Sequence, residues 1–153
     1  MNREIKFRAW CNGAMYYVEH LMYLTYGDDE FNVTLVGDLF IDGIRLPQET
    51  IETNGSEVEL MQFTGLIDKN EKEIYEGDIL RFYSQSRIDS LAGKPLLERV
   101  CEILWSNDEL CWWVRDHAGE GFKPEYCTDN KEFEIIGNIH KNPELLCQLL
   151  QSE

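Results

Sequence analysis

Basic residues are scarce in this sequence. Lys and Arg total 14 against 29 Asp and Glu, so the formal net charge of the 153 residues is −15, and no run of basic residues occurs. A protein that binds DNA or RNA through its phosphates needs clustered Lys and Arg, and anionic membranes also attract basic segments. We therefore expect neither direct nucleic acid binding nor membrane binding.

The sequence also lacks paired cysteines and long apolar runs. Its cysteines are odd in number and widely spaced, without a C-x-x-C sequence: Cys11, Cys101, Cys111, Cys127 and Cys147. Such a set is typical of a reducing compartment. The first residues, MNREIKFRAW, have no apolar core of an export signal, and no apolar run approaches the roughly 20 residues of a membrane span. We expect a cytoplasmic protein.

Signatures of catalysis are missing as well. No P-loop, G-x-S-x-G, H-E-x-x-H or G-x-G-x-x-G sequence occurs. Cys101, Cys111, His117 and Cys127 are zinc-compatible ligand types, but structural zinc ligands usually come in close pairs, which these do not form. We expect no catalytic residue, no cofactor and no metal, and whether these four side chains approach one another in space stays open.

Short apolar runs separated by turn residues dominate what is present. REIKFRAW alternates in character, and the Asn-Gly of CNGA (residues 11–14) predicts a hairpin with the following MYYV. Two later pairs predict further hairpins: RVCEILW with LCWWVRD, and GFKPEYC with EFEIIGNI. In the terminal NPELLCQLL, Asn142 as N-cap and Pro143 at the first helical position predict a short helix.

The segment at residues 42–57 carries Pro47, an Asn-Gly pair and many acids, and indicates a solvated connection. We therefore expect an N-terminal β-rich subdomain with an acidic connection at residues 1–56. A β-barrel-like domain with a C-terminal helix should follow at residues 57–153. The predicted fold class is α+β, mainly β, with short antiparallel strands.

One segment is unusually rich in turn-forming residues between short apolar runs: LMQFTGLIDKNEKEIYEGDILRFY, residues 60–83. Gly65 and Gly77 suit positive φ or close backbone approach. Asp68, Asn70 and Asp78 are residue types that accept backbone N–H groups in tight turns. The pattern favours the turns of a small β fold over a ligand site.

Three blocks resemble the YopX family of bacteriophage and prophage proteins: REIKFRAW at 3–10, LMQFTGLIDKNEKEIYEGDIL at 60–80, and FEIIGNIHKNPELL at 133–146. The sequence departs from the family pattern at Cys11, where a carboxylate is usual, and at Asn70-Glu71, where Asn-Gly is usual. The structural motif residues within these blocks are Trp10, Gly65, Gly77, Asp78, Gly137, Asn138 and Pro143.

The resemblance implies a small cytoplasmic protein encoded by phage or mobile DNA, in a family without an established enzymatic activity. No catalytic residue is carried over from such a family. The GDIL block followed by strand pairs is also similar to the entry into a small SH3-like barrel, an analogy that concerns fold and not function.

Adjacent Trp112 and Trp113 should face opposite sides of a strand, so they are our candidate interaction residues. We expect a non-enzymatic accessory protein that acts through protein–protein interaction or self-assembly, as a homo-oligomer or with an unidentified host or phage protein. The alternative is an acidic DNA mimic that blocks a host DNA-binding protein, because residues 28–59 hold nine acids and one base. An enzyme with a site built from isolated acids and His117 ranks last.

Overall fold

The computed structural model describes residues 4–26, 30–41, 44–54, 57–84, 91, 93–116, 119, 121–124 and 133–147. At residues 20–26, 30–35, 38–41, 44–54 and 84 it describes the backbone alone. The chain divides into two units, residues 1–63 and 64–153, and each is described by itself.

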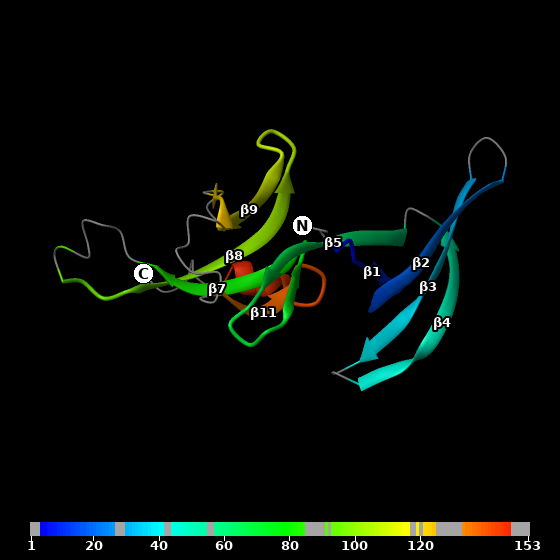
Figure 1. Ribbon diagram of the computed structural model, residues 1–153, viewed down its shortest axis with the longest axis horizontal. Coiled ribbons are helices and arrows are strands. Elements are labelled where there is room, and N and C mark those ends of the chain that lie inside the picture. The colour runs from blue at the N-terminus through cyan, green and yellow to red at the C-terminus, as the bar shows by residue number, and fades with distance from the viewer. Residues whose placement is uncertain are drawn as a thin grey trace. The chain divides into compact units, whose positions relative to one another are not determined.

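The described strands of the first unit form one antiparallel sheet, in which β2, β3 and β4 lie side by side as long strands (Figure 1). The hydrogen-bonded order is β4-β3-β2-β1-β5. The strands are β1 (Phe7–Cys11), β2 (Ala14–Tyr26), β3 (Glu30–Ile41), β4 (Ile44–Asn54) and β5 (Val58–Ile67), the last of which runs on into the second unit.

The predicted hairpin at residues 11–14 is present. Cys11 pairs with Ala14 across Asn12 and Gly13, whose φ values of 50° and 76° are both positive. That combination belongs to a type I′ turn, whose twist matches the twist of paired strands. A small core lies on one face of β1, β2 and β5, where Ala9, Cys11 and Tyr16 are buried.

The expected solvated connection at residues 42–57 is wrong. Most of it is β4, which pairs with β3 from Ile44 to Asn54 with a shift of register between the pairs Gly37↔Glu49 and Leu39↔Leu46. Pro47 lies on β4 within that irregularity, and β4 is an edge strand, where proline is tolerated. The boundary that we expected after residue 56 falls just before β5, whose first residues pair with β1.

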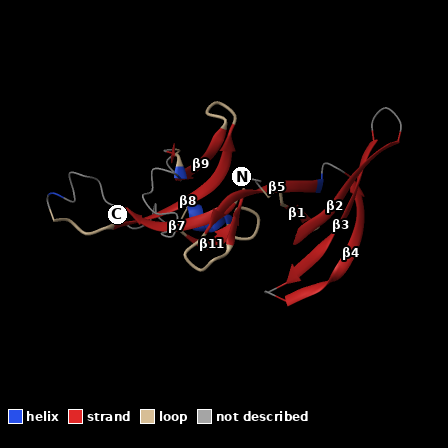
Figure 2. Cartoon of the chain, viewed as in Figure 1, coloured by secondary structure: helices blue, strands red, loops and turns tan. Residues whose placement is uncertain are grey.

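The second unit contains a five-stranded antiparallel sheet in the order β10-β9-β8-β7-β11, drawn as strands in Figure 2. The short β6 hydrogen-bonds to β5. The elements are β6 (Glu73–Tyr75), β7 (Asp78–Ser84), β8 (Leu97–Ser106), β9 (Cys111–Asp116), β10 (Gly121–Phe122), β11 (Glu134–Asn138) and the 3₁₀ helix η4 (Pro143–Leu146).

The core of this unit lies on one face of the sheet. Leu80 of β7 is opposite Cys101 of β8, and Ile103 is opposite Val114 of β9, so their side chains share a face. Edge-to-face ring contacts join Phe82 to Phe122 and Phe133. The buried members are Ile74, Leu80, Phe82, Cys101, Ile103, Val114 and Phe133.

The mainly β fold is confirmed, with two antiparallel sheets. The described strands of the second unit form no closed barrel, so the SH3-like barrel is not found there. The third predicted hairpin is wrong, because β10 and β11 lie at opposite edges of the sheet. In place of the expected C-terminal helix, the described residues form one 3₁₀ turn, in which Asn142 is the N-cap without a side-chain capping bond and Pro143 is the first residue.

Candidate interaction surface

The Asp68 carboxylate organises the turn after β5. Its side chain is 2% exposed. Oδ1 accepts the N–H groups of Asn70 at 2.8 Å and Lys72 at 2.9 Å, and Oδ2 accepts the N–H of Ile135 at 3.2 Å. Burial raises the pKa of Asp68, but the hydrogen bonds together lower it by more than burial raises it. The pKa therefore lies below its usual value. The side chain therefore joins the turn to β11.

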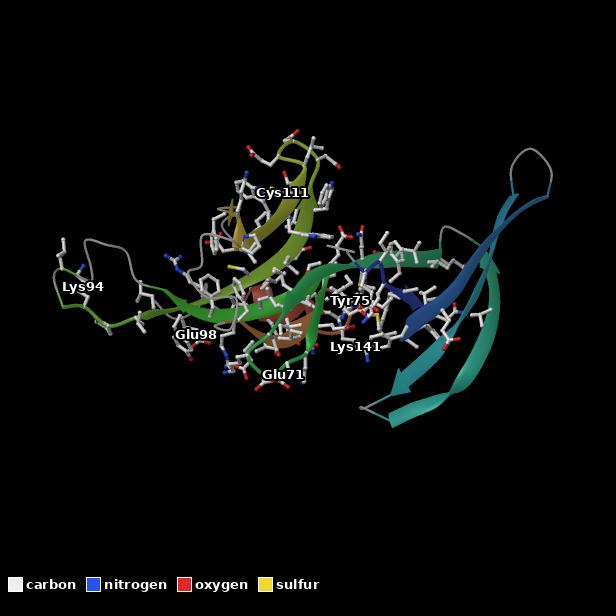
Figure 3. All side chains as sticks on the ribbon, viewed as in Figure 1. Glu71, Tyr75, Lys94, Glu98, Cys111 and Lys141 are labelled. Atoms are coloured by element: carbon white, nitrogen blue, oxygen red, sulfur yellow. The ribbon has the colours of Figure 1, made fainter. Side chains whose placement is uncertain are left out.

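Within this turn, Glu71 stands where the family usually has glycine. Its φ is 63°, in the left-handed region, and Figure 3 shows it on the loop between β5 and β6. The Glu71 N–H donates to the Asp68 carbonyl at 3.1 Å, and the Asp68 N–H donates to the Lys72 carbonyl at 2.8 Å. The turn is thus closed by two backbone hydrogen bonds and contains a non-glycine residue that carries conformational strain.

Backbone hydrogen bonds join the turn at Gly77-Asp78 to Ile103 and to Ile139. Gly77 has φ 75°, its N–H donates to the Ile103 carbonyl at 2.8 Å, and its carbonyl accepts the Ile139 N–H at 2.9 Å. The buried Asp78 carboxylate accepts the Tyr75 N–H at 2.8 Å. Gly77 thus has a left-handed backbone conformation, and both its N–H and its carbonyl are hydrogen-bonded. Glycine adopts this conformation without the strain that a side chain would add.

Gly137 and Asn138 shape the turn before η4. A Cβ on Gly137 would lie 2.7 Å from Asn142 Oδ1, so the two residues approach too closely for a side chain. Asn138 Oδ1 accepts the N–H groups of His140 and Lys141, both at 3.0 Å. These contacts shape the backbone of residues 137–142, which lead into Pro143.

Two further motif residues lie in strands. Gly65, with φ 86°, lies within β5, and the half-buried Trp10 of β1 is opposite Met15 and Glu59. The contacts found around the motif residues join parts of this chain to one another, as the turn interpretation of residues 60–83 predicts.

A cluster of charges that the sequence analysis missed crosses β7 and β11. Lys69 Nζ and Arg81 Nη2 both donate to Glu134 Oε2, at 2.8 and 2.7 Å. Hydrogen bonds from Lys69 and then Arg81 lower the pKa of Glu134, and the Glu134 carboxylate raises the pKa of Arg81. Only the pairing of two distant strands brings these residues together, so no local pattern could have revealed them.

Aromatic side chains gather on the β8–β9 hairpin. Trp112 is opposite Trp105, and their rings meet edge to face with centroids 5.2 Å apart. Trp113 is opposite Leu104 on the other face, and its ring lies so close to Gly121 that a Cβ there would be 2.6 Å from it. The two neighbouring tryptophans therefore lie on opposite faces, and both are half-buried.

The indole nitrogens of Trp112 and Trp113 are buried, and neither has a hydrogen-bond acceptor among the described residues. At the tip of the same hairpin, Leu110 is 73% exposed and has φ 52°. Positive φ is rare for a bulky residue. Cys111, the next residue, is labelled on this hairpin in Figure 3. Leu110 was not among the predicted residues, although an apolar residue after the polar SNDE is an available signal.

The register of β8 and β9 decides whether two of the zinc-compatible residues, Cys101 and Cys111, can bind the same ion. Cys101 is opposite Asp116 and Cys111 is opposite Ser106, so about 16 Å of strand separates the two cysteines. Zinc holds its thiolates about 2.3 Å from the metal, so these two cannot share an ion. His117 and Cys127 lie outside the described residues, and no group of metal-ligating side chains occurs within them.

The acidic segment that motivates the DNA-mimic alternative falls largely outside the described side chains. Within the acidic segment 28–59, residues 30–41 form β3, residues 44–54 form β4 and residues 58–59 begin β5, but most side chains of these strands are not described. Within the described part of the chain, no helix is long and apolar enough to cross a membrane.

The geometry defines a mainly β protein whose motif residues build turns and whose β8–β9 hairpin carries exposed and unsatisfied groups. A family model described as YopX protein matches residues 6–147. The chain therefore belongs to the YopX family, and the resemblance noted in its sequence is confirmed at that level.

Two solved structures are similar. The crystal structure of protein EF1440 from Enterococcus faecalis is 24% identical, with a TM-score of 0.54, over 95% of this chain and 99% of that one. The X-ray structure of protein yopX from Bacillus subtilis is 20% identical, with a TM-score of 0.52, over 95% of this chain and 97% of that one. At these identities the likeness shows the fold alone. A search of curated proteins found no match.

Proposed function

We propose that this chain is a non-enzymatic accessory protein of a phage or prophage, which acts in the cytoplasm through protein–protein interaction or self-assembly. Membership of the YopX family supports the setting through the resemblance described above. The surface that supports the mode of action is the β8–β9 hairpin.

Leu110 carries the proposal. A leucine that is 73% exposed gains almost nothing from burial, and its φ of 52° costs about 1–2 kcal/mol relative to ordinary backbone. Strained backbone clusters at functional sites, so an exposed leucine held in this conformation supports an interaction role. The half-buried Trp112 and Trp113 on the same hairpin support the same conclusion, since aromatic side chains are enriched in protein interfaces.

A capture experiment with a matched pair of variants tests the proposal. Tagged wild type, Leu110→Asn and Leu96→Asn are incubated with bacterial host lysate, and the bound proteins are identified by mass spectrometry. Asn tolerates positive φ, so Leu110→Asn should fold at least as stably as wild type and lose the bound protein. Leu96 is 59% exposed outside the hairpin, so Leu96→Asn should keep it. Identical capture by all three would refute a role for the hairpin.

The DNA-mimic alternative is tested in the same samples. Its carboxylates would hold a basic DNA-binding protein that a high-salt wash releases, whereas a partner bound through Leu110 and the tryptophans should resist salt. Capture that is lost in salt and unaffected by Leu110→Asn would favour the mimic.

A further inference from the structure

The tip of the β8–β9 hairpin projects from the sheet of the second unit (Figure 1). β7 pairs with β8 no further than Glu102, and β10 pairs with β9 only at Val114 and Arg115. Among the described strands, residues 104–113 therefore pair only with one another, and they end in the turn at residues 107–110. A projecting tip of this kind is complementary in shape to a pocket on a partner.

The charged side chains of this hairpin are paired, with one exception. Ion pairs hold every charged residue of β8, β9 and their turn except Asp108: Arg81–Glu98, Arg99–Asp116, Arg115–Glu102 and Lys123–Glu109. Asp108 is exposed, and its carboxylate has no partner among the described residues. The hairpin therefore offers one unpaired charge, and that charge is negative.

The unpaired carboxylate lies beside the exposed leucine. Glu109, between them in the sequence, is held by the hairpin itself, because its Oε2 lies 3.3 Å from Lys123 Nζ and its N–H donates to Ser106 Oγ at 3.2 Å. Asp108 and Leu110 are left to face solvent on either side of it, the leucine with 73% of its surface exposed. The tip thus presents an apolar group and a free carboxylate two residues apart.

We propose that the partner of the hairpin has an apolar pocket for Leu110 and a lysine or arginine at the rim of that pocket, which pairs with Asp108. This inference rests on the interaction part of the proposed function and names the chemistry of the partner. The net charge of −15 also favours a partner with a basic surface, whereas a second copy of this chain would be repelled.

The two groups should contribute to different rate constants. A side chain buried in a pocket at the centre of an interface supplies most of the binding energy and slows dissociation. A charge at the rim instead changes the association rate and its dependence on salt. Capture through Leu110 therefore still resists a high-salt wash, which measures dissociation, although Asp108 makes association sensitive to salt.

The test uses the protein whose capture from host lysate Leu110→Asn abolishes. Surface plasmon resonance measures its association with and dissociation from the full chain at low and at high salt. Asp108→Asn removes the tip carboxylate and Asp108→Lys reverses its charge. Glu144 is exposed outside the hairpin, so Glu144→Gln and Glu144→Lys make the same changes of charge elsewhere. Circular dichroism confirms that each variant is folded.

At low salt, we expect Asp108→Asn to lower the association rate constant at least about twofold and Asp108→Lys at least about fivefold, with smaller effects at high salt. The dissociation rate constants should change less, and both Glu144 variants should resemble wild type. Association that is unaffected by the Asp108 variants, or equally slowed by the matched Glu144 variants, would overturn this inference and leave binding through Leu110 standing. If no captured protein depends on Leu110, both this inference and the role of the hairpin in the proposed function are wrong.

Discussion

Replacing Asp68 by asparagine should destabilise the second unit by an amount that depends on pH. The change keeps the shape of the side chain and substitutes an NH₂ group for one carboxylate oxygen. Three backbone N–H groups point at the two oxygens, from Asn70, Lys72 and Ile135. An amide can offer its single oxygen to the turn or to β11, but the NH₂ group must then face an N–H donor on the other side.

The magnitude follows from the lost bonds. If the amide oxygen stays with Asn70 and Lys72, the Ile135 N–H loses a charged acceptor, which is worth about 1.5–3 kcal/mol. The two remaining bonds become neutral and weaker. We expect a loss of about 2–4 kcal/mol at pH 7, which would lower the urea midpoint by about 1–2 M. Tryptophan fluorescence during urea unfolding measures this loss, since Trp105, Trp112 and Trp113 lie in this unit.

The sign of the pH dependence is fixed by the direction of the pKa shift. The pKa of Asp68 is lower in the folded protein than in the unfolded chain, where it is near 3.9. The stability that the carboxylate contributes is therefore fully present above about pH 4–5 and is lost as the pH falls through the folded pKa. The difference between wild type and Asp68→Asn should shrink from pH 7 towards pH 3.

Glu134 also has a lowered pKa, but it is present in both proteins and cancels from that difference. Asp108 is exposed on the β8–β9 turn, so Asp108→Asn controls for the loss of one charge and should change stability little at either pH. Equal unfolding of wild type and Asp68→Asn at pH 7, or a gap of the same size at pH 3, would refute the assigned role of the carboxylate.

Three further substitutions test the turns by urea unfolding. Gly77→Val should cost about 1–3 kcal/mol because φ is 75°, and unchanged stability would show that this turn tolerates a side chain. Glu71→Gly should stabilise by about 0.5–1 kcal/mol, since relief of strain at φ 63° exceeds the entropic cost of glycine; a loss would place the strain elsewhere. Gly137→Ala should cost about 1–3 kcal/mol through its clash with Asn142, and the double variant with Asn142→Ala should recover part of this loss.

Local signals predicted local structure well. The hairpin at residues 11–14 and the pair β8–β9 each depend on a turn beside the strands that it joins, and both are present. The third predicted hairpin failed because strand order is set by long-range pairing: β11 pairs with β7, more than fifty residues earlier in the chain. Residues 44–54 failed for a related reason, since an acidic edge strand has the composition of a connection and is identified only by its partner β3.

The candidate surface was predicted in part. The sequence singled out Trp112 and Trp113 because adjacent residues of a strand must face opposite sides, and the register places them so. Leu110 was overlooked although it directly follows the polar SNDE, but its backbone angle and the room that Gly121 leaves for the Trp113 ring could not have been revealed by the sequence. Composition and spacing do not encode these features.

The family blocks at residues 60–80 and 133–146 are far apart in the sequence but meet in the second unit. Asp68 accepts the N–H of Ile135, Lys69 pairs with Glu134, and Gly77 accepts the N–H of Ile139. The blocks therefore act as one set of contacts within this unit, which gives their turn-forming and apolar residues a structural role. It follows that substitutions in the blocks should act on stability. Binding should instead depend on the β8–β9 hairpin, which lies between the two blocks in the sequence.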